Sequence, residues 1–222
     1  DLVIPPLIPH VNVLMGTKGV IRSCVSPANQ VAKCVRVTYD TTVLFDEMSN
    51  GGGIACDIEN AVRMNADCMA VQTFIGAPGE SRSLELLCRT ADAGARYGIP
   101  TLGVVAVGKQ MERTEKFFQL ATRVLAENGA NVVKSYYCDG FERVAAACPV
   151  PIVIAGGKKL PELEALEMAY RAIAEGARGV DMGRNIFQSD CPAGMAQAIG
   201  KVVHGGYTAQ QAFEVYQEIK NA

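Results

Sequence analysis

Histidine is nearly absent from this chain of 222 residues, which contains only His10 and His204. Zinc enzymes bind their metal through His, Cys or carboxylate ligands at short spacings. The sequence offers no such cluster, and no two of its eight cysteines form a Cys-x-x-Cys pair. We therefore expect no metal site.

Blocks of like charge and long apolar runs are also missing. The 21 basic and 23 acidic residues give a formal net charge of −2, which argues against nucleic-acid and anionic-membrane partners. No apolar run reaches the roughly 18 residues that span a bilayer, and no basic segment followed by an apolar one opens the sequence as in a signal peptide. We expect a cytoplasmic protein whose cysteines are reduced thiols in the core.

Seven short apolar runs rich in β-branched residues are the dominant pattern. They are continuous rather than alternating, as is typical of parallel strands buried on both faces. Hydrophobic residues make up 49 % of the chain, enough for a large core. The runs cover residues 11–15, 34–38, 68–75, 101–107, 131–137, 151–155 and 179–182.

Helical patterns fill most of the intervals between these runs. Apolar residues recur at spacings of three and four over 84–95, 117–125 and 166–173, the last after Pro161 as a first-turn residue. Thr208 and Gln211 have the spacing of a capping box that opens a final helix. The stretch 39–57, with Ser49-Asn50 and three glycines, predicts a long loop with a short hairpin.

Repeated strand–helix units without a linker indicate one α/β domain over residues 1–222. They favour a (β/α)₈ TIM barrel from which the first βα unit is missing, because seven runs are present where eight are expected. A doubly wound open sheet is the alternative.

Lys134 lies within or at the end of an otherwise buried strand. Burying an ammonium group is costly, so a lysine there needs a partner or a chemical role. Burial favours the neutral amine, which attacks carbonyl groups to form a Schiff base. The alternative is a structural lysine whose amine reaches the rim of the barrel.

Two later strand ends have the composition of a phosphate site. Gly156 and Gly157 follow one strand and allow close approach of the backbone to an anion. Gly183 ends the last strand, and Arg184 opens the next helical turn. Barrels commonly bind phosphate after their seventh and eighth strands, so we expect these four residues to bind a substrate phosphate.

Weaker candidates lie beside these residues. Thr17 and Gln72 end earlier strands and are expected either to line the pocket or to cap a loop. Lys158 either favours the neutral form of Lys134 through its like charge or is a solvated loop lysine.

Four segments, 133–137, 140–144, 148–161 and 179–190, resemble the class I aldolase family that contains the archaeal-type fructose-bisphosphate aldolases. The third includes Ile154-Ala155-Gly156-Gly157-Lys158-Lys159, and the fourth includes Val180-Asp181-Met182-Gly183-Arg184-Asn185. The resemblance extends over essentially the whole chain. It implies a (β/α)₈ barrel, Lys134 as the Schiff-base lysine, a phosphorylated substrate, and a homo-oligomer, specifically a decamer.

Two departures from the family pattern refine this expectation. Family members begin with a strand that ends in Asp-His-Gly, which is not found here. We therefore expect about 50–75 further residues before Asp1, including a strand between the 11–15 and 179–182 strands. Second, residues 103–108 carry no hydroxyl or acid where the fructose-bisphosphate aldolases carry a tyrosine.

The apolar strand end favours a thiolase subgroup of the family, which acts in autoinducer-2 breakdown. The resemblance then implies a Schiff-base enzyme without a bound cofactor that transfers an acetyl group to coenzyme A as co-substrate. The alternatives are a true class I aldolase, acting on fructose bisphosphate or forming a dideoxyheptulosonate, and a non-catalytic barrel that binds a phosphosugar.

Overall fold

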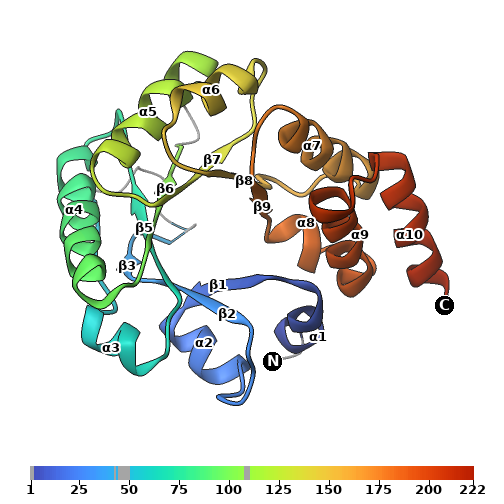
Figure 1. Cartoon of the computed structure of the whole chain (residues 1–222), viewed down its shortest axis with the longest axis horizontal. Coiled ribbons are helices and arrows are strands. Elements are labelled where there is room, and N and C mark those ends of the chain that lie inside the picture. The colour runs from blue at the N-terminus through green and yellow to red at the C-terminus, as the bar shows by residue number, and fades with distance from the viewer. Residues whose placement is uncertain (1–2, 43, 45–50, 108–110) are drawn as a thin grey trace.

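The computed structural model describes residues 3–42, 44, 51–107 and 111–222. Its centre is a parallel sheet of seven strands that curls around an axis (Figure 1). Within the described residues all seven predicted strands are confirmed. In sheet order they are β1 (Val13–Thr17), β2 (Ala32–Arg36), β5 (Cys68–Thr73), β6 (Thr101–Val105), β7 (Val132–Tyr136), β8 (Ile152–Ala155) and β9 (Gly179–Asp181).

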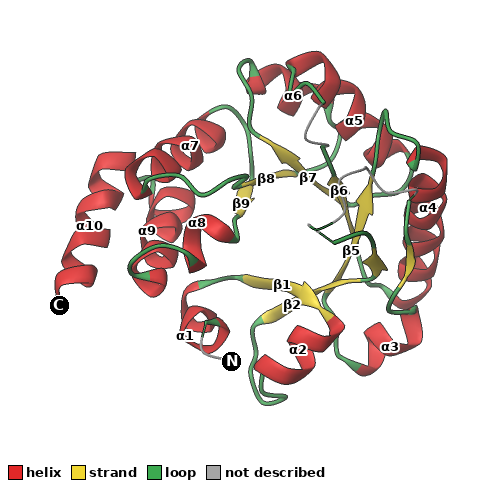
Figure 2. Ribbon diagram, turned by 180° about the vertical axis from the view of Figure 1, so that it is seen from behind, coloured by secondary structure: helices red, strands yellow, loops and turns green. Residues whose placement is uncertain are grey.

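The longer helices lie on the outer side of the curled sheet, and the short α8 lies next to the end of β9 (Figure 2). The helices are α1 (Ile4–Leu7), α2 (Lys18–Cys24), α3 (Ile58–Arg63), α4 (Glu80–Tyr97), α5 (Glu115–Glu127), α6 (Phe141–Ala147), α7 (Glu162–Ala174), α8 (Arg184–Phe187), α9 (Pro192–Gly205) and α10 (Ala209–Asn221), with a 3₁₀ turn at Ile8–His10. A doubly wound sheet would carry helices on both faces. The sequential strand order and one-sided helices therefore exclude that alternative.

Two apolar layers follow from the alternation of side chains along each strand. Outward residues such as Val35, Val133 and Ile154 join the large core beneath the helices. Inward residues form a smaller cluster around Cys34 and Leu102 inside the sheet. A strand in this sheet is therefore buried on both faces, which explains the continuous apolar runs.

The ends of some strands and helices differ from the expectation, because hydrogen bonds determine where these elements begin and end. The first two strands were expected at 11–15 and 34–38 but pair over Val13–Thr17 and Ala32–Arg36, because Gly16 and Thr17 lie opposite Val35 and Arg36. Helix α7 begins at Glu162, with Pro161 at its N-cap rather than inside its first turn.

Two local predictions are confirmed. The capping box of Thr208 and Gln211 opens α10. The expected hairpin within 39–57 corresponds to the antiparallel pair β3 (Thr38–Tyr39) and β4 (Gly53–Ile54). Ser49 and Asn50 lie outside the described residues.

Strands β1 and β9 form the two edges of the sheet. All eight cysteines are free thiols, buried or half-buried. In the described part of the chain, no helix has both the length and the apolar composition that crossing a membrane requires.

Candidate active site

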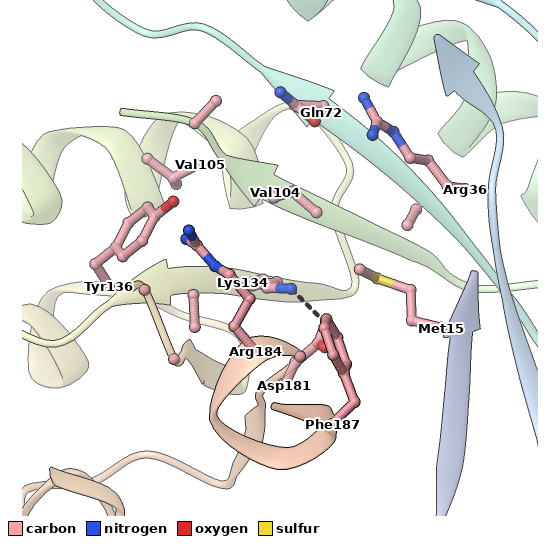
Figure 3. Close-up of a pocket in the computed structure, with 16 residues that line it drawn as sticks. Met15, Arg36, Gln72, Val104, Val105, Lys134, Tyr136, Asp181, Arg184 and Phe187 are labelled. Carbon is pink, nitrogen blue, oxygen red and sulfur yellow. Dashed lines mark ion pairs between the residues drawn. The ribbon is translucent and has the colours of Figure 1, made fainter. Parts of the chain in front are cut away.

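A pocket of about 310 Å³ lies inside the curled sheet at the carboxyl ends of the strands (Figure 3). Residues from most of the strands, from the loop after β8 and from α8 contribute to its wall. They are Met15, Arg36, Ala70, Gln72, Val104, Val105, Ala106, Lys134, Tyr136, Ala155, Gly156, Gly157, Asp181, Gly183, Arg184 and Phe187.

Lys134 points into this pocket from the middle of β7. Its Nζ lies 2.9 Å from Oδ2 of Asp181, and the two side chains are 14 % and 24 % exposed. Asp181 is the last residue of β9, and β8 lies between the two strands. The costly burial of the lysine is therefore offset by an ion pair, and the carboxylate is placed to accept the proton that the amine must lose before it attacks a carbonyl.

The backbone after β8 is held open toward the pocket by two glycines. Gly157 has φ +66°, a conformation that side chains rarely adopt. A Cβ at Gly156 would lie 2.8 Å from Nδ2 of Asn185. That amide donates a 2.7 Å hydrogen bond to the carbonyl of Gly156, and Oδ1 of Asn185 accepts one of 2.7 Å from the backbone of Leu160. The fully buried Asn185 therefore fixes this loop against α8.

Arg184 is the first residue of α8 and points into the pocket beside Lys134 (Figure 3). Gly183, at the N-cap of this helix, is also part of the wall. A second guanidinium lies nearby, because Arg113 covers the ring of Tyr136 at 4.3 Å from its centroid. A Cβ added at Gly157 would lie 3.9 Å from Nη1 of Arg113. This corner combines glycine backbone with two cations, a combination suited to a phosphate group.

The other side of the pocket is formed by β2 and β5. Arg36 enters it from the last position of β2 (Figure 3). Gln72 lines it from β5, and its Nε2 donates a 3.4 Å hydrogen bond to Oδ2 of Asp40. Between this side and Lys134, the wall formed by β6 is apolar.

Six of the eight sequence-predicted site residues share this pocket. They are Lys134, Gly156, Gly157, Gly183, Arg184 and Gln72. Thr17 and Lys158 are not part of its wall. The hydroxyl of Thr17 accepts a 3.5 Å hydrogen bond from the backbone of Val20 and caps α2, and Lys158 is exposed. Thr17 therefore has the capping role, and Lys158 corresponds to a solvated loop lysine.

Four residues of this region were not predicted from the sequence. Asp181, Arg36 and Tyr136 line the pocket, and Arg113 covers Tyr136. Asp181 and Arg36 are charged residues at the ends of buried strands, and a charge in an apolar run is the signal that identified Lys134. Arg113 lies two residues before α5 and carries no such signal.

The apolar strand end expected within 103–108 is present over the described residues, since Val104, Val105 and Ala106 line the pocket, whereas Gly108 lies outside the described residues. A hydroxyl nevertheless reaches the pocket from elsewhere. Tyr136 supplies it from β7, two residues after Lys134 and therefore on the same face of the strand.

The family model for DeoC/LacD aldolases matches residues 3–189 of this chain, which is most of its length. The chain belongs to the DeoC/LacD aldolase family. The match includes all the pocket residues described above.

Several relatives have about 50 % sequence identity to this chain. An uncharacterized aldolase of Pasteurella multocida (strain Pm70) is 50 % identical over 99 % of this chain and 76 % of its own length. The 3-hydroxy-5-phosphonooxypentane-2,4-dione thiolase of Photorhabdus laumondii is 50 % identical over 97 % of this chain and 74 % of its own. The thiolase of the same name from Escherichia coli (strain K12) is 49 % identical over the same shares.

Solved structures show the same fold at low identity. An archaeal fructose 1,6-bisphosphate aldolase has a TM-score of 0.80 at 23 % identity, covering 90 % of this chain and 82 % of its own. The fructose-bisphosphate aldolase of Slackia heliotrinireducens has a TM-score of 0.82 at 20 % identity, covering 96 % and 76 %. The curled sheet of this aldolase is therefore of the TIM-barrel type.

Proposed function

We propose that this aldolase cleaves a phosphorylated dicarbonyl compound through a Schiff base on Lys134 and transfers the released acyl group to coenzyme A. The observation that carries the proposal is the ion pair of Lys134 with Asp181, next to two glycine loops and Arg184. The relatives named 3-hydroxy-5-phosphonooxypentane-2,4-dione thiolase, which are about 50 % identical to this chain, support the choice of substrate.

The first stage uses Lys134 as a nucleophile. Asp181 accepts a proton from the ammonium, and the neutral amine adds to the ketone next to the phosphorylated carbon. Loss of water gives an iminium ion, which can accept the electron pair of the adjacent C–C bond. The phosphate is bound by Arg184 and by the backbone of Gly156, Gly157 and Gly183, which orients the ketone toward the lysine.

The second stage breaks the C–C bond. The thiolate of coenzyme A adds to the distal carbonyl carbon and forms a C–S bond. When this adduct collapses, the carbonyl is restored and the C–C electron pair moves into the iminium to give an enamine. Protonation of the enamine and hydrolysis then release dihydroxyacetone phosphate and regenerate Lys134. Coenzyme A acts here as a co-substrate, and no resident cofactor is required.

Reductive trapping tests the proposal. The full-length protein is treated with dihydroxyacetone phosphate and borohydride, and its peptides are analysed by mass spectrometry. We expect the reduced adduct on the peptide that contains Lys134 and none in Lys134→Met, with Lys158→Met as the matched control that still forms it. An adduct on Lys158, or no adduct on the unaltered protein, would contradict the assignment.

A class I aldolase is the second candidate function, and the hydroxyl of Tyr136 in the pocket favours it because aldol cleavage needs a proton acceptor near the leaving aldehyde. Coenzyme A distinguishes the two. An aldolase turns over fructose 1,6-bisphosphate without a thiol, whereas the proposed reaction yields acetyl-coenzyme A from the dione.

Two further proposals concern assembly and location, and the family resemblance supports the first. We propose a homo-oligomer, specifically a decamer, on this ground, and a cytoplasmic location because all eight cysteines are free thiols. Light scattering of the full-length protein during size-exclusion chromatography tests the first. Fractionation of cells that express the protein tests the second.

A further inference from the structure

Arg36 is the cation of the pocket that the phosphate proposal does not use. It ends β2, three strands from Lys134 toward the β1 edge of the sheet, whereas Arg184 follows β9, two strands from Lys134 toward the other edge. Because the sheet is curled, both side chains enter the same pocket, Arg184 beside Lys134 and Arg36 beside Gln72 (Figure 3).

The guanidinium of Arg36 has donors without acceptors. Its Nε is buried and has no hydrogen-bond partner in the described part of the chain. Over residues 3–42, 44, 51–107 and 111–222, no carboxylate forms an ion pair with it, and the nearby amide of Gln72 is bonded to Asp40 instead. Arg36 as a whole is half-buried, but a buried donor without a partner is costly, so the position of Nε is best explained by an oxygen of a bound ligand.

The proposed reaction indicates which oxygen of the substrate contacts Arg36. If the phosphate lies at Arg184 and the reacting ketone at Lys134, the remainder of the substrate extends toward β2. That remainder is the acyl group, whose carbonyl oxygen becomes negatively charged when a thiolate adds to its carbon. Donors that are fixed in advance at a developing oxyanion lower the barrier of such additions.

We infer that Arg36 is a further catalytic residue, which donates hydrogen bonds to the distal carbonyl oxygen of the substrate and stabilises the oxyanion formed by thiolate addition. This inference rests on the proposed function. In the step concerned, the thiolate forms the C–S bond and the carbonyl π electrons move to oxygen. When this adduct collapses, the oxygen electrons restore the carbonyl and the C–C bond breaks. The electron pair of that bond moves into the iminium on Lys134, and coenzyme A is the thiol.

This role of Arg36 predicts that loss of its guanidinium affects acetyl transfer but not the binding of dihydroxyacetone phosphate. Dihydroxyacetone phosphate has a phosphate and a ketone but no acyl group, so its binding should not depend on Arg36. Formation of acetyl-coenzyme A from 3-hydroxy-5-phosphonooxypentane-2,4-dione requires the oxyanion and should depend on it strongly. A merely structural role would affect both measurements.

The test compares Arg36→Met and Arg36→Lys with Arg123→Ala as control, in the full-length protein. Methionine retains an apolar stem and removes the donors, and Arg123 is a 65 % exposed arginine on α5. For Arg36→Met we expect kcat for acetyl-coenzyme A formation to fall about 100-fold to 1,000-fold, with the yield of borohydride-trapped dihydroxyacetone phosphate unchanged. Arg36→Lys should be intermediate, and added guanidinium ion should partly restore Arg36→Met.

Two outcomes would overturn the inference. One is acyl transfer by Arg36→Met at the rate of the unaltered protein, and the other is an equal loss of trapping and transfer. Absence of an adduct on Lys134 in the unaltered protein would instead contradict the proposed function, so the two failures are distinguishable.

Discussion

The interior of the curled sheet has two halves with opposite character. The half at the carboxyl ends of the strands is the 310 Å³ pocket, which contains Lys134, Asp181 and two arginines. The half toward the amino ends borders a cavity of about 510 Å³ with a mainly apolar wall that includes Cys34, Leu102, Val132 and Val153. Met15 and Asp181 contribute to both.

The two halves of the interior are separated by only two residues along a strand, which is the spacing of successive inward-facing side chains. On β2 the inward residue changes from Cys34 to Arg36, and on β7 it changes from Val132 to Lys134. The apolar half buries surface and stabilises the fold. The polar half holds charges that are offset by an ion pair in the case of Lys134 and, by our inference, by substrate in the case of Arg36. We therefore expect substitutions in the two halves to affect different measurements.

The largest effect is expected for Asp181→Asn in the polar half. The amide keeps the size of the side chain but cannot accept the proton of Lys134, so Schiff-base formation should slow about 100-fold to 10,000-fold. The measurement is the rate of borohydride trapping with dihydroxyacetone phosphate. Asp190→Asn is the control, because Asp190 pairs with Lys220 away from the pocket wall. An unchanged trapping rate would remove Asp181 from the reaction.

Leu102→Ala tests the apolar half. Leu102 is 6 % exposed, and its loss should lower the free energy of unfolding by about 2–3 kcal/mol, the low end for such changes because it already borders a cavity. Urea denaturation measures this change. Leu120→Ala, at a 59 % exposed position on α5, should change stability by less than about 0.5 kcal/mol. Slower Schiff-base formation in folded Leu102→Ala would show that the halves are not independent.

Arg184→Ala returns to the polar half and concerns binding. Loss of a charge-assisted contact to phosphate should weaken the affinity for dihydroxyacetone phosphate by about 1.5–3 kcal/mol, roughly 10-fold to 150-fold. Isothermal titration calorimetry measures the change, and unfolding by urea should be unaffected because Arg184 is exposed. Unchanged affinity would mean that phosphate binds elsewhere, and Arg113→Ala would then be the next variant.

The smallest effect is expected for an ion pair outside the pocket. Nζ of Lys159 lies 2.7 Å from Oε1 of Glu162, and this hydrogen bond lowers the pKa of Glu162 below its ordinary value of 4.5. A lowered carboxyl pKa stabilises the folded state above the unfolded value, and the contribution is lost as pH falls through the folded value. Lys159→Met should therefore cost about 0.2–1 kcal/mol at neutral pH.

Urea denaturation at two pH values checks this prediction. The difference between Lys159→Met and the unaltered protein should disappear under acidic conditions in which Glu162 is protonated in both states. A difference that persists there would indicate loss of the 2.8 Å hydrogen bond that Nζ of Lys159 donates to the carbonyl of Leu160 rather than loss of the ion pair.

The repeated architecture could be read from the sequence because each unit is specified locally. A continuous apolar run requires burial on both faces, and spacings of three and four place one face of a helix against it. The seven strands, the capping box at Thr208 and the hairpin within 39–57 follow from such local rules. The ends of β1 and β2 do not, because pairing with the neighbouring strand decides them.

For the candidate site as well, some features could be predicted from the sequence and others could not. Lys134 was predictable because it is a charge within an apolar run, and the glycine loops and Arg184 were predictable because a strand end or a turn marks each in the sequence. The pairing of Lys134 with Asp181 and the entry of Arg36 and Arg184 into one pocket were decided only by the curl of the sheet. Curvature brings side chains from strands that are not neighbours to one enclosed space, where charges must find partners, and no local pattern encodes which strand ends will meet there.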